Sequence, residues 1–238
     1  MELTIIAPMY NEEGNVENTF RAIKEVFDKI GIDWELIFVN DGSTDDTLKR
    51  AKELEKKEPR LRVLGYPVNV GAGRALREGF KAAVGRYVIS VDFDLSYSPD
   101  QILKIYQKLS GDPSIDAVLG SCYMPGGRVE GVDPYRLFVS WLGNMVLSMV
   151  FGGRVRTITC VFRGYKKEVV QGLNLHLDKK DIHLEILAGL LNRPIKVVEI
   201  PAVLRLRKKG KSKFKLWRTS RSHLRFIFSY LSGKYKNI

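Results

Sequence analysis

Short apolar runs alternate with amphipathic stretches along the first half of the chain. Five runs rich in β-branched and aromatic residues predict buried strands, at residues 3–9, 34–39, 61–65, 87–91 and 116–121. Apolar residues recur at helical spacing over about 15–30, 45–57 and 69–84, and Pro99 begins another helix. Strands that alternate with helices in this way indicate an α/β fold with a mostly parallel central sheet flanked by helices.

Polar residues follow four consecutive predicted strands. The segments are 10–12 (Tyr-Asn-Glu), 40–41 (Asn-Asp), 69–71 (Asn-Val-Gly) and 92–94 (Asp-Phe-Asp). The carboxyl ends of parallel strands meet at one edge of the sheet, where ligands of such folds bind. We therefore expect these segments to form a nucleotide site.

The strand at 87–91 ends in two acids, Asp92 and Asp94. Alternation along an extended chain sends both carboxylates to the same side, with Phe93 on the other. Two neighbouring carboxylates suit a hard divalent cation, Mg²⁺ or Mn²⁺, whose coordination is completed by substrate phosphates. The alternative interpretation is that the two acids cap the following turn.

The composition is that of a folded protein with one sizeable domain and a small appendage at most. Of 238 residues, 45% are hydrophobic and 28% are charged. The two cysteines, Cys122 and Cys160, lack metal-ligand spacing, and we expect buried thiols in a reducing compartment. Met1 leads directly into a strand, without a signal-peptide pattern. Both features predict a cytoplasmic location.

The net charge of +12 is concentrated at the C-terminal end. Residues 203–238 hold twelve Lys and Arg and no acid, whereas the other 27 basic residues are matched by 27 acids. A basic segment of this kind attracts the phosphates of nucleic acid, lipid headgroups or a substrate. The neutral body does not support an extended nucleic-acid face, so a nucleic-acid-binding protein is the less favoured class.

Two later segments suggest contact with a membrane. Residues 137–151 contain eleven apolar residues in fifteen. As a helix of about 22 Å they fall short of the roughly 30 Å of a bilayer core, so this helix is either buried or interfacial.

Residues 211–231 form a predicted helix with an apolar stripe beside a basic one. We therefore expect a domain at 1–210 and a basic amphipathic tail at 211–238, attached peripherally to the anionic cytoplasmic face of a membrane.

Three polar segments carry a resemblance to a known family. Segments 8–13 (Pro-Met-Tyr-Asn-Glu-Glu), 40–45 (Asn-Asp-Gly-Ser-Thr-Asp) and 92–96 (Asp-Phe-Asp-Leu-Ser) resemble the successive motifs of family 2 glycosyltransferases. Segments 120–127 and 207–213 resemble the dolichol-phosphate mannosyltransferase branch of that family. The resemblance extends from residue 3 to about 213. It implies a Rossmann-like GT-A fold and a nucleotide-sugar donor.

The resemblance also implies a role for each matching residue on the donor side. The residues that would flank the nucleotide are Pro8, Tyr10 and Glu12. Asp41 would hold the base or the ribose. Asp92 and Asp94 would hold the metal on the donor diphosphate, and Asp94 is a catalytic candidate.

On the acceptor side, the matching residues are cations and hydroxyls. Arg136 and Ser140 match an Arg-x-x-x-Ser motif that faces phosphates. A mobile acceptor loop is matched by Arg207, Ser212 and Lys213. By the resemblance, Ser140 and Ser212 would bind the acceptor phosphate together with Arg136, and the catalytic cations would be Arg136, Arg207 and Lys213.

Two residues depart from the family pattern. Cys122 stands where the family has Arg, and Thr157 stands where it has Asp. A lipid-phosphate acceptor is already an anion and needs no strong base, whereas a hydroxyl acceptor needs a carboxylate to take its proton. Asp181 and Glu185 are the candidates for that base, with solvated helix acids as the alternative interpretation.

The motifs together predict a metal-dependent, inverting glycosyltransferase. The expected reaction moves mannose from GDP-mannose to polyprenyl (dolichyl) phosphate. The alternatives are another nucleotide sugar, such as UDP-glucose, or a hydroxyl acceptor. An NAD-dependent enzyme is not expected, because no Gly-x-Gly-x-x-Gly segment follows the first strand.

Overall fold

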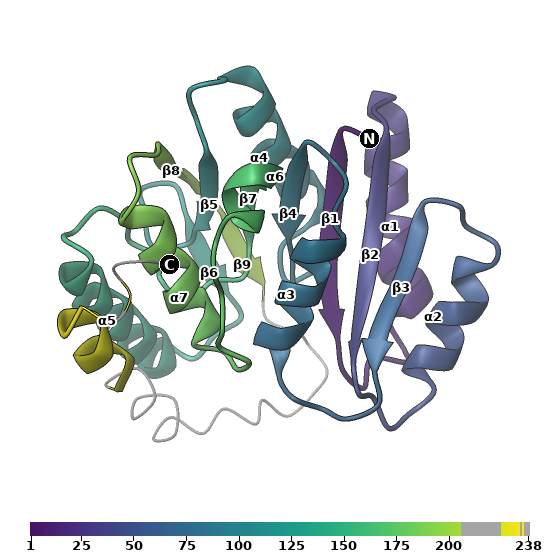
Figure 1. Cartoon of the computed structure of the whole chain (residues 1–238), viewed down its shortest axis with the longest axis horizontal. Helices are drawn as coiled ribbons and strands as arrows, with labels where there is room; N and C mark the ends of the chain where they lie inside the picture. Colours follow the sequence, from purple (N-terminus) through teal and green to yellow (C-terminus); the bar gives the residue numbers. More distant parts are fainter. Residues whose placement is uncertain (206–224, 234, 236–238) are drawn as a thin grey trace.

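A seven-stranded sheet forms the centre of the molecule, in the order β3-β2-β1-β4-β7-β5-β8 (Figure 1). The computed structural model describes residues 1–205, 225–233 and 235. The strands of this sheet are β1 (Leu3–Met9), β2 (Trp34–Asp41), β3 (Leu61–Tyr66), β4 (Tyr87–Ser90), β5 (Ala117–Ser121), β7 (Arg163–Lys166) and β8 (Val197–Pro201). β3, β2, β1 and β4 are parallel neighbours, so their carboxyl ends meet at one edge, as predicted.

One strand of the sheet runs against the others. β7 lies between β4 and β5 and is antiparallel to both. The five predicted strands are confirmed, whereas β7 is a strand that the hydrophobic pattern did not indicate. Its four residues, Arg-Gly-Tyr-Lys, are too few and too polar for a recognisable alternation, yet Arg163 and Tyr165 are fully buried. A separate two-stranded sheet pairs β6 (Arg128–Glu130) with β9 (Val203–Arg205).

Helices cover both faces of the sheet and bury two hydrophobic cores. One face packs on α1 (Val16–Ile30), α2 (Thr47–Glu55) and α4 (Pro99–Gly111). The other face packs on α3 (Ala72–Ala82), α6 (Lys167–Gln171) and α7 (Ile182–Leu191). Of the stripe predicted for the first helix, Val16, Phe20, Ile23 and Phe27 lie in the core, whereas Ile30 at the end of the helix is exposed. This three-layer arrangement leaves the carboxyl edge of the sheet open for a site.

α5 (Pro134–Val150) is the least buried long helix of the described chain. Only Asn144 and Leu147 are buried on it. Its exposed large apolar side chains are Tyr135, Phe138, Trp141, Leu142, Met145, Val146 and Met149. The interpretation of this segment as a buried core helix is therefore wrong. No helix among the described residues is long and apolar enough to cross a bilayer.

The described part of the C-terminal tail packs beside α5 (Figure 1). Residues 225–231 are helical, and the rest of the helix predicted for 211–231 lies outside the described residues. Phe226 is buried, and its ring lies 6.5 Å from that of Phe151 and 4.6 Å from that of Tyr235. Phe228 and Leu231 on the same helix are exposed.

Candidate active site

The turns that follow β1 and β2 are joined by hydrogen bonds at the carboxyl edge. Asn11 adopts a positive φ of 55°, and its side-chain Oδ1 accepts from Thr44 N at 2.8 Å. Ser43 Oγ accepts from Asn11 N at 3.0 Å, and Thr47 Oγ1 accepts from Glu12 N at 2.7 Å. These bonds explain why short polar residues occupy both motifs: each turn supplies the donors and acceptors of the other.

The sequence-predicted donor residues lie along this edge. Pro8 pairs with Val39 in the β1–β2 ladder, and Tyr10 is exposed just beyond it. Glu12 Oε2 accepts a hydrogen bond from Asn15 Nδ2 at 2.6 Å. Pro8, Tyr10 and Glu12 thus lie on the same edge as Asp41 and the two aspartates after β4, because the three strands β1, β2 and β4 are neighbours in the sheet.

Asp41 is buried and organises the loop between β3 and α3. Its Oδ1 accepts from Val70 N at 2.9 Å and from Gly71 N at 3.0 Å, and its Oδ2 accepts from Asn69 Nδ2 at 2.9 Å. Gly71 has φ of 131°, and a Cβ there would lie 2.5 Å from the carbonyl oxygen of Asp178, so the loop requires glycine. The Asn69-Val70-Gly71 motif is therefore a partner of Asp41.

A cation–π pair lies next to Asp41 and was not predicted from the sequence. The guanidinium of Arg74, at the start of α3, sits 4.3 Å from the centroid of the Tyr66 ring. Burial, followed by the nearby Asp41 carboxylate, raises the pKa of Tyr66 well above its ordinary value. Tyr66 is the last residue of β3, and Arg74 lies in the first turn of α3. The sequence alone does not show that the loop between them brings their side chains into contact.

Asp92 and Asp94 follow β4 at the same edge. β4 ends at Ser90, and Val91 N still donates to Ile6 O at 2.9 Å, so the extended chain reaches the first aspartate. Desolvation by the surrounding protein, and next the repulsion of Asp94, raise the pKa of Asp92 to about 7. A divalent cation would relieve both effects, since it offers positive charge and oxygen coordination at once.

Asp94 lies in a sharp turn that holds its carboxylate in place. Leu95, the next residue, has φ of 55°, in the left-handed region that a leucine rarely adopts. Asp94 Oδ1 accepts from Ser96 N at 3.0 Å and from Ser96 Oγ at 2.6 Å. The described residues contain no group of three or more His, Cys, Asp or Glu side chains that could hold a metal. Two neighbouring carboxylates are oxygen donors of the kind that a hard cation takes together with substrate phosphates and water.

Lys180 is a further cation near the aspartates that the sequence did not single out. Its positive charge lowers the pKa of Asp92 against the two stronger effects. The carbonyl of Lys180 accepts from His183 N at 3.3 Å in the first turn of α7, and Arg163 Nη1 donates to His183 O at 2.9 Å. Arg163 also pairs with Ser90 in the β4–β7 ladder, two residues before Asp92. Arg163 therefore links the first turn of α7 to the end of β4.

The two candidate bases have different surroundings. Glu185 is buried, and its carboxylate accepts from His176 N at 3.1 Å and from Leu177 N at 2.9 Å. Burial raises the pKa of Glu185 despite these bonds. Glu185 therefore secures the loop before α7, which is a structural role. Asp181 stands at the N-cap position of α7, one residue after Lys180.

The acceptor-side residues are partly brought together. Arg136 is exposed in the first turn of α5, which Asp133 caps by accepting from Arg136 N at 3.2 Å. Ser140, one turn later, accepts a hydrogen bond from the Tyr123 hydroxyl at 2.8 Å. The 120–127 motif and the Arg136–Ser140 motif thus meet. Arg207, Ser212 and Lys213 lie outside the described residues.

The two residues that depart from the family pattern are neutral and buried. Cys122 is buried, and this burial raises the pKa of its thiol to about 11. Thr157 is buried as well, and its Oγ1 lies 2.7 Å from Ser121 Oγ. Its backbone N donates to Glu199 Oε1 at 2.9 Å. Cys122 and Thr157 therefore belong to one cluster at the end of β5, which also contains the Glu199 carboxylate.

Comparisons with known proteins agree with this geometry. Residues 4–173 match the family model Glycosyl transferase family 2. The chain is 32% identical over 231 residues to a dolichol-phosphate mannosyltransferase of Pyrococcus furiosus, covering 96% of this chain and 63% of that protein. It is 28% identical over 216 residues to a polyprenol monophosphomannose synthase of Mycolicibacterium smegmatis, covering 88% and 79%. The chain thus spans less than two thirds of the Pyrococcus relative.

A solved structure shows the same fold. Glucosyl-3-phosphoglycerate synthase from Mycobacterium tuberculosis, crystallised with Mn²⁺, UDP and phosphoglyceric acid, superposes with a TM-score of 0.72 at 20% identity. The match covers 98% of this chain and 78% of that one. The mostly parallel sheet with helices on both faces is therefore the GT-A fold, and this chain belongs to glycosyl transferase family 2.

Proposed function

We propose that this protein transfers mannose from GDP-mannose to a polyprenyl phosphate, with inversion and with a divalent metal ion. The observation that carries the proposal is the meeting of Asp92 and Asp94 with the joined turns at 10–13 and 40–47 on one sheet edge. The mannose donor and the lipid-phosphate acceptor are supported by the names of the two relatives above.

The donor half of the reaction requires stabilisation of the negative charge that develops on the leaving diphosphate. Transfer forms a bond between an acceptor oxygen and the anomeric carbon and breaks the bond from that carbon to the diphosphate, which leaves with its electron pair. Asp92 and Asp94 would hold Mg²⁺ or Mn²⁺, which supplies Lewis-acid stabilisation of the leaving diphosphate. Pro8, Tyr10, Glu12 and Asp41 would bind the nucleotide, as their places on the same edge allow.

The acceptor half needs cations to bind a phosphate. A phosphate acceptor is already an anion, so no base has to remove a proton. Arg136 presents an exposed guanidinium, and Ser140 lies one turn away. In the proposal, Arg207, Ser212 and Lys213 add further phosphate contacts. The segment that carries them follows β9, whose last residue Arg205 donates from its backbone N to Ser96 O, beside Asp94, at 2.9 Å.

A hydroxyl acceptor is the second candidate, because Cys122 supplies no positive charge at the position where the family pattern has Arg. Glu185 is a poor base in that case, since backbone N–H groups occupy its carboxylate. Asp181 is the residue to test. With a hydroxyl acceptor, the donor could also be a different nucleotide sugar, and UDP-glucose is the alternative to test.

We propose in addition that the protein attaches peripherally to an anionic membrane at its cytoplasmic face. The support is the row of exposed apolar side chains on α5, beside a C-terminal helix that exposes Phe228 and Leu231. Residues 203–238, which include this C-terminal helix, carry twelve basic residues and no acid, and such a segment favours binding to anionic headgroups. The domain at 1–210 would hold the donor site, and the tail at 211–238 would carry Ser212 and Lys213 and assist attachment.

The donor is tested by thermal stabilisation with GDP, UDP and their sugars, each with and without Mn²⁺. A ligand at a hundred times its Kd adds about 2.7 kcal/mol of stability. Stabilisation by the guanine nucleotide only, dependent on Mn²⁺, supports the proposal. The acceptor is tested by transfer to a short polyprenyl phosphate against an alcohol of the same chain length. Preference for the alcohol would contradict the phosphate acceptor.

The membrane surface is tested by flotation with vesicles of anionic and of neutral lipid. Phe138→Glu with Met149→Glu on α5 should reduce binding to anionic vesicles, because a charge in the apolar face opposes insertion. Leu48→Glu, on the exposed side of α2, is the matched control and should bind as the unmodified protein does. Equal binding by the control and the α5 variant would contradict the proposed surface.

A further inference from the structure

The turn that carries Asp94 is held by hydrogen bonds from two elements that are distant in sequence. We infer that Thr19 of α1 and Gln101 of α4 are positioning residues that aim the two aspartates at the donor's metal. The inference rests on the proposed function, since it concerns how the proposed metal-binding carboxylates are held.

The first contact comes from α1. Thr19 is 1% exposed, and its Oγ1 donates to the backbone carbonyl of Phe93, between the two aspartates, at 2.7 Å. The Phe93 ring is itself buried and lies 4.7 Å from the Phe38 ring. A hydroxyl in the buried stripe of an amphipathic helix has no packing advantage over a valine, so this hydrogen bond accounts for the threonine.

The second contact comes from β9. Arg205 N donates to Ser96 O at 2.9 Å, and Ser96 in turn donates twice to Asp94 Oδ1. Any displacement of β9 would therefore move Ser96, and with it the carboxylate of Asp94.

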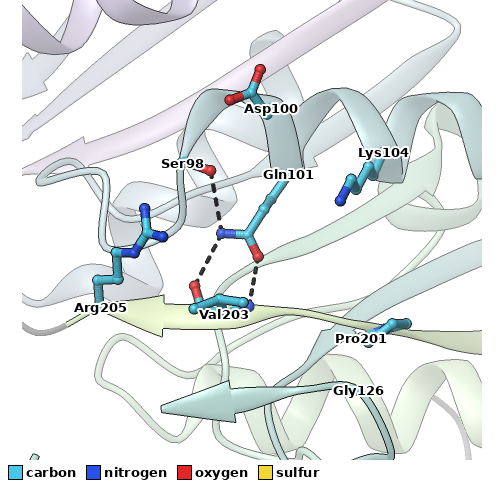
Figure 2. Close-up of a pocket in the computed structure, with 8 residues that line it drawn as sticks. All are labelled: Ser98, Asp100, Gln101, Lys104, Gly126, Pro201, Val203 and Arg205. Atoms are coloured by element: carbon cyan, nitrogen blue, oxygen red, sulfur yellow. Dashed lines mark hydrogen bonds between the residues drawn. The ribbon is translucent and has the colours of Figure 1, made fainter. Parts of the chain in front are cut away.

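Gln101 fixes the position of β9. Figure 2 shows its side-chain amide beside Val203: Gln101 Oε1 accepts from Val203 N at 2.6 Å, and Gln101 Nε2 donates to Val203 O at 3.0 Å. The amide satisfies both backbone groups of Val203, as a neighbouring strand would. β9 is thereby tied to the first turn of α4, which begins only four residues after Leu95.

The turn requires such support because its backbone is strained. Leu95 holds a φ of 55° without the side-chain hydrogen bonds that make this region tolerable for Asn or Asp. Strain of this kind persists only where the surroundings over-determine the conformation. Residues that orient the ligands of a metal typically change metal affinity by about ten- to a hundredfold when they are removed.

The test compares matched pairs by calorimetry of Mn²⁺ with GDP and, in parallel, with UDP. Thr19→Val deletes the bond to Phe93. Its control Thr4→Val deletes two buried bonds at the opposite edge of the sheet, one to Glu35 at 2.7 Å and one from Gly85 N at 2.9 Å. Gln101→Leu is compared with Gln107→Leu, an exposed position on the same helix. We expect Mn²⁺–nucleotide affinity to fall by about tenfold in Thr19→Val and Gln101→Leu and by less than about twofold in the controls.

The stability of each variant, measured by urea unfolding, separates positioning from general damage. Thr4→Val should lose at least as much stability as Thr19→Val, because it loses two buried hydrogen bonds whereas Thr19→Val loses one, while only Thr19→Val loses metal affinity. Equal affinity of Thr19→Val and Thr4→Val, in a wild type that does bind, would overturn this inference alone. A wild type that binds Mn²⁺ with neither nucleotide would overturn the proposed metal site and this inference together.

Discussion

The Tyr123 hydroxyl donates a hydrogen bond of 2.8 Å to Ser140 Oγ, which joins two segments seventeen residues apart. Tyr123 belongs to the glycine-rich segment after β5, and Ser140 lies on α5, one turn after Arg136. The contact fixes the exposed start of α5 against the sheet edge. Arg136, for which we propose acceptor-phosphate binding, therefore lies one turn before a residue of α5 that is tied to the segment after β5.

Arg136→Lys should impair transfer although the charge is kept. A guanidinium binds two phosphate oxygens through parallel hydrogen bonds, which an ammonium cannot reproduce. We expect the KM for polyprenyl phosphate to rise by about tenfold, equivalent to roughly 1.4 kcal/mol, with the KM for the donor little changed. Arg154→Lys, just beyond the other end of α5, is the control. Equal kinetics for the two variants would rule out a bidentate role for Arg136.

Asp94→Asn should abolish most transfer while the fold survives. The amide keeps the side-chain shape and an oxygen for Ser96 but removes a charge from a hard-cation site. We expect a loss of about hundredfold or more in kcat, with the free energy of unfolding changed by less than about 1 kcal/mol. Steady-state kinetics and urea unfolding check this. Full activity of the variant, or of the wild type in excess chelator, would contradict the two-aspartate site.

The raised pKa of Asp92 predicts how stability depends on pH. Between its ordinary value of 3.8 and about 7, the folded protein keeps a proton on Asp92 that the unfolded chain has released. This contribution to stability is fully present below pH 3.8 and is lost as pH rises to about 7, at up to roughly 1.4 kcal/mol per pH unit. Asp92→Asn should remove this slope in the metal-free protein, as thermal unfolding from pH 4 to 8 would show.

The same pKa predicts competition between protons and metal. Below about pH 7, a metal ion must displace the proton of Asp92, so affinity for Mn²⁺ should fall by up to about tenfold per pH unit. Calorimetry at pH 5.5, 6.5 and 7.5 measures this fall. Affinity that stays constant over this range would show that Asp92 is not a ligand.

Replacing Phe226 with alanine should destabilise the protein much more than the same replacement at Phe228. Phe226 is 4% exposed and packs against Phe151, so Phe226→Ala should cost about 3–5 kcal/mol of unfolding free energy. Phe228 is 74% exposed, and Phe228→Ala should cost less than about 0.5 kcal/mol. Urea unfolding distinguishes the two. Deletion of the whole tail would remove Phe226 as well, so single substitutions are the cleaner test of membrane binding.

Cys122→Arg restores the residue of the family pattern but should destabilise this protein. Cys122 is 6% exposed beside the Ser121–Thr157 hydroxyl pair, so a guanidinium there would be too large for the space. We expect a loss of about 2–3 kcal/mol, partly recovered in the double variant with Thr157→Asp. Cys122→Ser is the control. No recovery in the double variant would show that the two departures are independent of each other.

The sequence by itself determined the layer architecture and the edge at which the site forms. Both follow from local patterns: the apolar runs before Asn40 and Asp92 are strands whatever surrounds them, and parallel strands bring their polar ends to one side. The positions of Asp92 and Asp94 on the same edge as Tyr10 and Asp41 could therefore be predicted.

The tertiary structure alone decided which distant residues touch. The insertion of β7, the outward face of α5 and the hydrogen bonds from Thr19 to Phe93 and from Gln101 to Val203 each depend on a partner many residues away. An isolated threonine or glutamine carries no periodic signal, and an apolar helix has the same pattern whether buried or exposed. Such contacts are set by how the layers pack, because only packing selects one partner among many with the same chemistry.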